Sequence, residues 1–154
     1  MLIRYGARAD ALDKNGRTPI FYAFVKVGAP HVKTEIDPFE TVSSLCALPD
    51  CDVNVKDNWC KTPLHYAAQR GSVISGRYLI KMHANVDPYD NDHNTPLAIA
   101  FLNGHSNMAT MLIDNRANVL EMATQIDLNK LIEEQKNKMT EKNKLKALKI
   151  LQRS

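Results

Sequence analysis

Three short segments of this chain share one order of apolar and polar positions. Each begins with Thr-Pro and continues with mostly apolar residues, at residues 18–23, 62–67 and 95–100. In the second segment Leu64, Ala67 and Ala68 have the spacing of one helix face, so the pattern predicts an amphipathic helix. Thr can cap such a helix, and Pro fits its first position because the missing N–H is not needed there. We therefore expect helices to begin at Thr18, Thr62 and Thr95.

The same frame surrounds all three segments. An Asp stands five residues before each Thr, and an Ala or Cys stands six residues before that Asp. The frame positions are Asp13, Asp57 and Asp90, preceded by Ala7, Cys51 and Ala84, with Ala117 opening a fourth round. We expect each Asp to close a tight turn by accepting hydrogen bonds from the backbone amides ahead of it. Gly71 and Gly104 mark the ends of two first helices, and a second helix is expected after each.

The spacing of the segments identifies an internal repeat. Thr62 and Thr95 lie 33 residues apart, and the first two segments lie 44 apart, which is one period plus 11 residues. Repetition at this period predicts a solenoid. The second copy, Thr62-Pro63-Leu64-His65-Tyr66-Ala67, carries the whole T-P-L-H-x-A motif, and over about residues 2 to 120 the chain resembles an ankyrin-repeat array. The resemblance implies an all-α helix-turn-helix solenoid with protruding β-turn fingers, about three units, a partial N-terminal unit and a C-terminal helical cap.

The histidine of the motif occurs in the second copy alone. Phe21 and Ala98 take the place of His65 in the other two copies. In ankyrin-like proteins this His hydrogen-bonds within and between repeats, so the first and third units are expected to be less firmly tied.

Glycine is used unevenly among the repeats. Gly16 holds the turn position that Cys60 and His93 take in the later copies, so a left-handed backbone there would be optional or strained in those two. Gly76 lies inside the predicted second helix of unit two, where it costs about 1 kcal/mol relative to Ala unless a neighbour packs closely against it.

Eleven extra residues fall between the two helices of the first unit. The segment 28–36 contains Pro30 and has no helical period. Asp37, Pro38 and Glu40 then predict the start of the second helix, with Asp37 as N-cap and Pro38 at the first helical position. Insertions in repeat proteins map to one face, often the binding face. The alternative is a tolerated surface loop, because closing a longer loop costs little.

Both ends of the chain depart from the repeat. Leu2, Ile3 and Tyr5 fall in the last turn of a second helix whose first helix is absent, so we expect them to be frayed or packed against another molecule, self-association included. This half unit indicates a piece of a longer protein. At the other end, residues 124–127 resemble a capping box. The predicted organisation is an ankyrin-repeat array at 1–123, with an 11-residue insertion near 28–36, and a C-terminal capping helix with a basic helical tail or linker at 124–154.

Charge and cysteine usage narrow the protein class. The net charge is +3, and residues 124–154 carry eight Lys or Arg against four acidic residues. Such a tail is a solvated helix face or linker, or a contact for nucleic acid, an acidic membrane or an acidic partner. The sequence has no apolar run of about 20 residues and no signal-peptide pattern. The three cysteines, Cys46, Cys51 and Cys60, are an odd number and lack metal-like spacing. This cysteine usage favours an intracellular protein, cytoplasmic or nuclear, and the sequence predicts no membrane partner.

The sequence predicts no catalytic residue, metal or cofactor. Its His and Cys residues fall on different positions of the repeat and form no C-x-x-C or H-x-x-x-H pair, and no Walker or Rossmann glycine motif is present. A Cys–His pair brought together by folding stays open, but a thin solenoid offers little of the enclosed pocket that catalysis needs. The resemblance adds one modification. An Asn at the position of Asn54 can be hydroxylated in ankyrin-like proteins, and a turn-stabilising amide is the alternative role.

Binding of a protein or peptide is the predicted function. In ankyrin-like arrays partners dock on the concave face, formed by the finger tips and the exposed side of the first helices. The matching tip positions are Lys14, Asn15, Arg17, Asn58, Trp59, Lys61, Asn91, Asp92 and Asn94. The matching first-helix positions are Val25, Lys26, Gln69, Arg70, Leu102 and Asn103.

Trp59 is the most informative of these positions. It is the single Trp of the chain and stands where the core of the stack does not require it. Trp and Arg are enriched in interface hot spots, so Trp59 with Arg17 and Arg70 would form such a patch. The alternative is a structural role in which Trp59 folds over a neighbouring finger.

Three functions are compatible with this sequence. The first is a protein–protein interaction scaffold or adaptor module within a longer protein. The second is a substrate-recruiting or regulatory ankyrin domain of an enzyme whose catalytic part lies outside this chain. The third is nucleic-acid binding through the tail with Arg17, Arg70 and Lys61, which ranks last because Asn91, Asp92 and Asn94 interrupt the basic residues.

Overall fold

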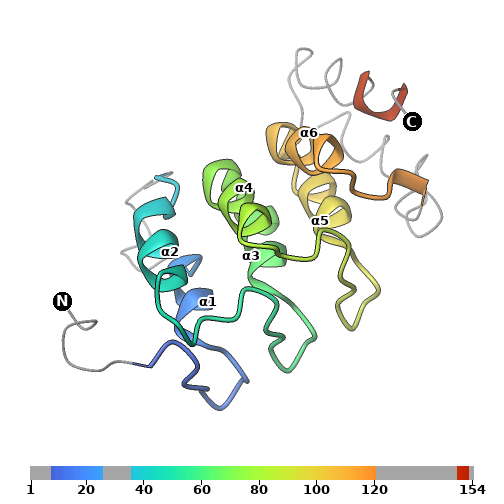
Figure 1. The fold of residues 1–154 in the computed structure, drawn as a ribbon. Coiled ribbons are helices and arrows are strands. Elements are labelled where there is room, and N and C mark those ends of the chain that lie inside the picture. The colour runs from blue at the N-terminus through green and yellow to red at the C-terminus, as the bar shows by residue number, and fades with distance from the viewer. Residues whose placement is uncertain (1–7, 26–35, 121–148, 153–154) are drawn as a thin grey trace, which may run out of the picture.

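The helices form two layers of antiparallel pairs. The computed structural model describes residues 8–25, 36–120 and 149–152. Over these ranges the secondary structure is helical, with turns and no strand. The helices are α1 (Pro19–Ala23), α2 (Phe39–Cys46), α3 (Pro63–Arg70), α4 (Val73–Lys81), α5 (Pro96–Leu102) and α6 (Ser106–Asp114). The first helices, α1, α3 and α5, pack side by side, the second helices, α2, α4 and α6, form the other layer, and each first helix packs on its own second helix (Figure 1).

The first helices begin where the sequence predicts. Thr18, Thr62 and Thr95 are the N-cap residues, each in extended conformation, and Pro follows at the first helical position. The Thr95 hydroxyl caps its helix by accepting from the N–H of Ala98 at 3.2 Å. The Thr18 hydroxyl makes no such bond and is buried without a partner among the described residues. The prediction is therefore correct for the boundaries, and wrong for the capping bond at Thr18.

The core lies between the two layers. Leu64, Leu97, Leu79 and Leu112 are each 0% exposed. Leu64 and Leu97 hold one repeat position in units two and three, and Leu79 and Leu112 hold another. Four alanines on α3 and α5 are also fully buried: Ala67, Ala68, Ala98 and Ala100. Small side chains at these positions let α3 and α5 approach closely, so each unit buries its apolar face against the next one.

Asp37 has a different role from the predicted one. The N-cap of α2 is Pro38, and α2 has no side-chain cap. The Asp37 carboxylate instead accepts hydrogen bonds from the backbone N–H groups of Ile74 (2.8 Å) and Ser75 (3.1 Å) and from the Ser75 hydroxyl. It therefore caps the start of α4 in the next unit, where a negative charge interacts favourably with the helix dipole. Sequence spacing could not reveal this bond because it joins residues 37 positions apart.

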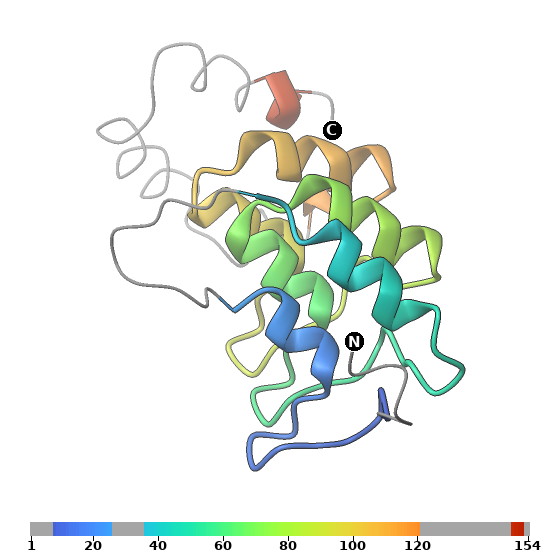
Figure 2. The ribbon, with the colours of Figure 1, turned by 90° about the vertical axis from the view of Figure 1, so that its left-hand side faces the viewer.

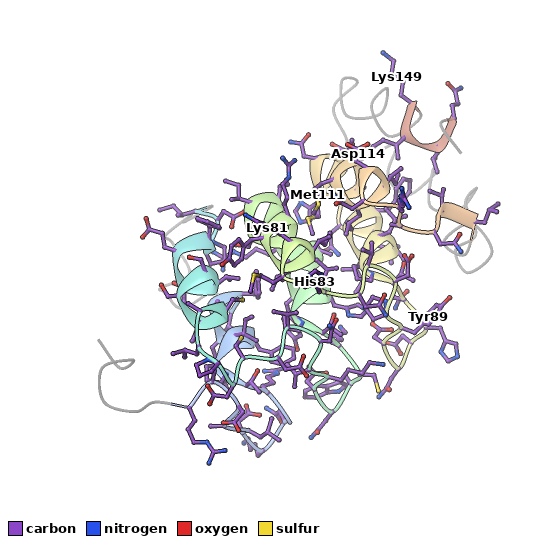
Figure 3. All side chains as sticks on the ribbon, viewed as in Figure 1. Lys81, His83, Tyr89, Met111, Asp114 and Lys149 are labelled. Atoms are coloured by element: carbon purple, nitrogen blue, oxygen red, sulfur yellow. The ribbon has the colours of Figure 1, made fainter. Side chains whose placement is uncertain are left out.

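The mid-helix glycine of α4 allows close packing of α6. A Cβ atom added to Gly76 would come within 2.7 Å of the Met108 methyl and 3.0 Å of the Met111 methyl. Met111 belongs to α6, which packs on α4 (Figure 3). The predicted condition for tolerating this glycine, a closely packed neighbour, is confirmed.

The chain ends are described only in part. Leu2, Ile3 and Tyr5, most of the insertion at 28–36 and the predicted capping box at 124–127 lie outside the described residues. Residues 119–120 are already helical, before the predicted start at Thr124. Residues 149–152 form a short helical segment in which Ile150 is buried, and Leu151 packs against the core of the array.

Candidate functional site

Each protruding turn is built on one aspartate. We call residues 13–17, 57–61 and 90–94 fingers one, two and three. The Oδ1 atom of each Asp accepts from the backbone N–H groups two and four residues ahead, at 2.8–3.0 Å. The N–H of the Asp donates to the carbonyl four residues ahead, at 3.0–3.1 Å. These bonds confirm the predicted turn and give all three fingers one frame.

A left-handed residue completes every finger. Gly16, Cys60 and His93 have φ angles of 71°, 57° and 62°. The left-handed conformation is therefore required at this position, and the two non-glycine residues adopt it at a cost in backbone strain. The sequence left open whether these copies would keep it.

The fingers are joined side by side along the stack. The N–H of Asn58 donates to the carbonyl of Asn15 at 2.9 Å, and the N–H of Asn91 donates to the carbonyl of Trp59 at 3.0 Å. The side-chain amides of Asn58 and Asn91 also donate to the preceding finger, to the carbonyls of Lys14 (3.2 Å) and Asn58 (3.3 Å). Two of the predicted contact residues, Asn58 and Asn91, thus hold the fingers in a row below the first helices (Figure 2).

Finger two carries an aromatic and charged cluster. The Arg17 guanidinium carbon lies 5.1 Å from the centroid of the Trp59 ring and 5.5 Å from that of Tyr66. Arg17 Nη2 donates to the Tyr66 hydroxyl at 3.0 Å, and this hydroxyl donates to Asp57 Oδ2 at 2.7 Å. Arg17 Nε also lies 3.7 Å from Asp57 Oδ2. We call Arg17, Asp57, Trp59 and Tyr66 the finger-two cluster.

Burial and hydrogen bonding keep the Tyr66 phenol of this cluster protonated. Asp57 has a side chain that is 0% exposed, yet its two oxygens accept from two amides and one hydroxyl and face a guanidinium. Burial, and then the hydrogen bond to Asp57, raise the pKa of Tyr66 to about 12. The phenol therefore stays protonated and acts as the donor that orders the cluster. Trp59 is 46% exposed, so the side of the cluster that faces solvent is aromatic.

Finger one repeats part of this arrangement, and finger three does not. The Tyr22 hydroxyl donates to Asp13 Oδ2 at 2.5 Å, as Tyr66 does to Asp57. This bond lowers the pKa of Asp13 and raises that of Tyr22. In unit three Ile99 stands at the position of the tyrosine. Asp90 Oδ2 is buried and has no hydrogen-bond partner among the described residues.

His65 joins units two and three as the resemblance implied. Its Nδ1 accepts from the N–H of Thr62 at 3.0 Å, and its Nε2 lies 3.0 Å from the carbonyl oxygen of Asn94. Since one partner can only donate and the other can only accept, the ring is neutral with its proton on Nε2. Burial lowers the pKa of His65, which agrees with a neutral ring.

The other predicted contact residues divide into two groups. Arg70 donates to the carbonyls of Phe24 (3.3 Å) and Ile36 (3.2 Å), so it anchors both ends of the first-unit insertion and does not join Trp59. The Asn103 amide donates to the carbonyl of Ile99 on its own helix. The remaining predicted contacts lie exposed or half-buried on the fingers and on or just after the first helices: Lys14, Asn15, Val25, Lys61, Gln69, Asp92, Asn94 and Leu102. Lys26 lies outside the described residues.

Tyr66 and Asp57 belong to the finger-two cluster, and they were not among the contact residues predicted from the sequence. A signal was present, because a Tyr stands nine residues after the finger Asp in units one and two and is absent from unit three. The spacing alone does not say that the hydroxyl turns toward the carboxylate. The contact of Arg17 with both aromatic rings joins residues of different units, and no local pattern encodes it.

Asn54 uses its whole side chain to join two units. Its Nδ2 donates to the carbonyl of His83 at 3.1 Å, and its Oδ1 accepts from the N–H of Asn85 at 2.7 Å. Asp87 holds the N–H of Asn118 in the same way in the next unit, at 3.1 Å. The turn-stabilising role of this position is therefore present, and hydroxylation of Asn54 stays a prediction.

Neither a metal site nor a membrane-spanning helix is found among the described residues. No group of three or more His, Cys, Asp or Glu side chains there could hold a metal ion. None of the helices described has both the length and the apolar character needed to cross a membrane.

A family model for ankyrin repeats in three copies matches residues 31–123. The chain belongs to the ankyrin-repeat family. The match covers units two and three and the later part of unit one, and it agrees with the paired helices and the fingers (Figure 1). The predicted all-α solenoid is confirmed.

Several curated proteins contain a similar segment. A poly [ADP-ribose] polymerase tankyrase of Caenorhabditis elegans is 38% identical over 119 residues, which is 73% of this chain and 5% of that protein. A putative E3 ubiquitin-protein ligase XBAT34 of Arabidopsis thaliana is 34% identical over 105 residues, which is 67% of this chain and 25% of that protein. A putative ankyrin repeat protein of Fowlpox virus is 37% identical over 68 residues. The matched segment therefore makes up a quarter or less of the tankyrase and of the ubiquitin ligase.

Proposed function

We propose that this ankyrin-repeat chain is a protein-interaction module that binds a protein or peptide on the face formed by its fingers and first helices, with the finger-two cluster at the centre. The observation that carries the proposal is the exposed ring of Trp59, held over the Arg17 guanidinium. Ankyrin-repeat domains are binding modules in general, and this chain's own residues supply the candidate centre.

The cluster has the properties of an interface hot spot. Trp and Arg are the residues that most often dominate interfaces, because a large rigid ring buries much area and a guanidinium donates several hydrogen bonds. Here Tyr66 and Asp57 fix the guanidinium of Arg17 before any partner arrives. A partner therefore loses little additional side-chain entropy on binding, which favours affinity. The contact between Trp59 and Arg17 also gives Trp59 part of the structural role considered as its alternative.

The test is a selection of peptides from a display library on the wild-type chain, followed by calorimetry. For a selected peptide, Trp59→Ala should weaken binding by about 30-fold or more, equivalent to about 2 kcal/mol. The variant should lose no more than about 1 kcal/mol of folding stability, because it removes one partly exposed cation–π contact and no core position.

The matched control is Ile74→Ala. Ile74 is 58% exposed, like Trp59 a large apolar surface residue, but lies on α4 in the other helix layer. It should leave the affinity unchanged. If Trp59→Ala unfolds the chain or binds selected peptides as tightly as wild type, Trp59 is a structural residue and the site lies elsewhere, with the insertion near 28–36 as the next candidate.

The second candidate function is recruitment or regulation within a larger enzyme. It is favoured because the chain matches only 5% of the tankyrase and 25% of the ubiquitin ligase, whose names state enzymatic activities. In such a protein, Trp59→Ala would slow turnover of a protein substrate and leave turnover of a small-molecule substrate unchanged. If the variant turned over the protein substrate as fast as the wild type does, the scaffold function would be the better proposal.

Nucleic-acid binding is the weakest of the candidates. The basic residues Arg17 and Lys61 of fingers one and two give way to Asn94 in finger three, which also carries Asp92. Arg17 and Arg70 are also engaged by protein groups. A salt-dependent affinity for single-stranded RNA that is lost with the 124–154 segment would favour it over the protein-binding proposal.

The proposed organisation has two parts, the array at 1–123 and the segment 124–154. Limited proteolysis should then release an array fragment that keeps the circular dichroism of the folded helices. Self-association through the N-terminal half unit is a separate proposal, and sedimentation of wild type and of a Leu2→Asp, Ile3→Asp variant tests it.

A further inference from the structure

Two repeat positions are joined by a backbone hydrogen bond in units two and three. The N–H of Ala84 donates to the carbonyl of Leu79 at 2.9 Å, and the N–H of Ala117 donates to that of Leu112 at 3.0 Å. The chain thus folds back at the end of each second helix, and residues five apart meet at the core. In unit one these two positions are both cysteines, Cys46 and Cys51.

The turn between the two cysteines keeps this proximity by a different path. Cys46 is the last residue of α2, and the N–H of Cys51 donates to the carbonyl of Leu48 at 3.2 Å, which returns the chain toward the helix. Cys46 is buried in the core, and Cys51 is half-buried and packs against it. Both thiols are free.

The two thiol groups also affect each other's ionisation. Hydrogen bonding of the Cys46 thiol toward Cys51 is the main cause that raises the pKa of Cys46 and lowers that of Cys51. The negative charges of Asp50 and Asp52 act against this on Cys51. Cys51 is therefore the more accessible and the more readily ionised thiol of the pair, and thiolate character with access determines which cysteine an oxidant attacks.

We propose that Cys46 and Cys51 are a peroxide-sensitive modification site, in which Cys51 reacts first and Cys46 closes a reversible disulfide. The oxidant is hydrogen peroxide. The Cys51 thiolate attacks one peroxide oxygen, an S–O bond forms, the O–O bond breaks, and hydroxide leaves with the electron pair. Cys46 then attacks the sulfenic sulfur of Cys51, the S–S bond forms, the S–O bond breaks, and the oxygen leaves as water with the Cys46 proton. Two thiols are oxidised and one peroxide is reduced to two waters.

The location gives the modification a structural consequence. Cys51 precedes Asp52 and Asn54, and Asn54 joins this turn to residues 83 and 85 of the next unit. Cys46 ends α2, which packs on α4. A bond between the two sulfurs would therefore act where units one and two meet.

The sequence makes the test direct. Trypsin cleaves after Lys33, Lys56 and Lys61, so Cys46 and Cys51 fall in one peptide, 34–56, and Cys60 falls in another, 57–61. The folded chain is treated with hydrogen peroxide, alkylated, digested and weighed. We expect the 34–56 peptide to lose the mass of two hydrogens and take up no alkyl group, and the 57–61 peptide to be alkylated. Dithiothreitol should restore both thiols of the 34–56 peptide.

The variants follow from the chain's own repeats. Cys51→Ala introduces the alanine that units two and three have at Ala84 and Ala117. Cys46→Leu introduces the leucine that they have at Leu79 and Leu112. Both variants are therefore expected to fold, and circular dichroism checks this. Cys46→Leu should accumulate a sulfenic acid on Cys51 that dimedone labels, Cys51→Ala should give neither product, and the Cys60→Ser control should form the bond at the wild-type rate. The proposal is overturned if peroxide yields only dimers through Cys60, if the 34–56 peptide gains oxygen without closing, or if Cys46 is labelled first.

Discussion

Finger two and finger three share one backbone and differ in how their aspartate is satisfied. Asp57 accepts two amide bonds and the Tyr66 hydroxyl, and faces the Arg17 guanidinium. Asp90 accepts the same two amide bonds, but its second oxygen has no partner in the described part of the chain. Two positions differ, since Ile99 replaces the tyrosine that units one and two use, and Lys61 stands in finger two where finger one has Arg17.

The difference separates what builds the repeat from what builds the site. The amide bonds of the Asp and the left-handed turn residue recur in all three fingers, so they belong to the scaffold. The tyrosine bond is variable, and it reaches its full form where an exposed Trp59 and Arg17 share it. Unit two therefore combines the firmest polar ties with the most interface-like surface.

The largest expected effect tests whether the two units have equal cores. Leu64 and Leu97 are both 0% exposed at the same repeat position. Leu64→Ala and Leu97→Ala should each lower the free energy of unfolding by about 2–5 kcal/mol, because each leaves a core cavity. Urea unfolding followed by circular dichroism measures both. Costs that differ by more than the usual spread would place the difference between the units in the core instead of in the fingers.

The next effect compares the two aspartates directly. Asp57→Ala should cost about 2–4 kcal/mol, because it removes a buried acceptor and leaves Arg17 and the Tyr66 hydroxyl without their partner. Asp90→Ala should cost only about 1 kcal/mol, because the lost amide bonds are offset by removal of a buried oxygen that has no donor. Urea unfolding monitored by the fluorescence of Trp59 and by circular dichroism measures both variants.

The reverse order of these two costs would contradict the comparison. It would mean that Asp90 Oδ2 has a partner in solution that compensates it. Asp13→Ala is an internal reference, because Asp13 has the tyrosine bond from Tyr22 but is more exposed, and its cost should fall between the other two.

The sequence predicted the frame well and the side-chain partners poorly. Helix starts and the finger Asp follow from local spacing, because the interacting groups lie within a few residues of one another. The cap that Asp37 makes on α4 and the bonds of Arg70 to Phe24 and Ile36 cross 34 to 46 positions of chain. Such contacts depend on how the units stack. Asp37, which was expected to cap its own helix, and Arg70, which was expected to contact a partner, therefore have structural roles between units.

A smaller effect concerns the other tie of unit two, His65. His65→Ala gives this position the residue that unit three has at Ala98, and it should cost about 1–3 kcal/mol at pH 7.5 through lost hydrogen bonds and packing. The cost should shrink on acidification. Burial lowers the pKa of His65 in the folded chain below the value of about 6.5 that it has in the unfolded chain. As the pH falls below about 6.5, the unfolded chain therefore takes up a proton that the folded chain does not. The wild type then loses up to about 1.4 kcal/mol of stability per pH unit.

Urea unfolding of the wild type and His65→Ala at pH 7.5 and 5.5 measures this loss as a change in their difference. Other titrating groups are common to both proteins and cancel. A difference that stays constant or grows toward pH 5.5 would show that folded His65 accepts a proton without penalty, and its neutral role between Thr62 and Asn94 would be wrong.

The smallest expected effect restores the missing donor of unit three. Ile99→Tyr places a hydroxyl where Tyr66 holds one for Asp57, and a bond to the buried Asp90 Oδ2 should contribute about 0.5–1.5 kcal/mol. Ile99 is 6% exposed, so the larger ring carries its own packing cost. Ile99→Phe adds the same ring without the hydroxyl, and the stability of the Tyr variant minus that of the Phe variant isolates the bond. A positive difference that disappears in an Asp90→Ala background assigns it to this pair. Equal stability of the Tyr and Phe variants would mean that the third finger is not built to accept the hydroxyl.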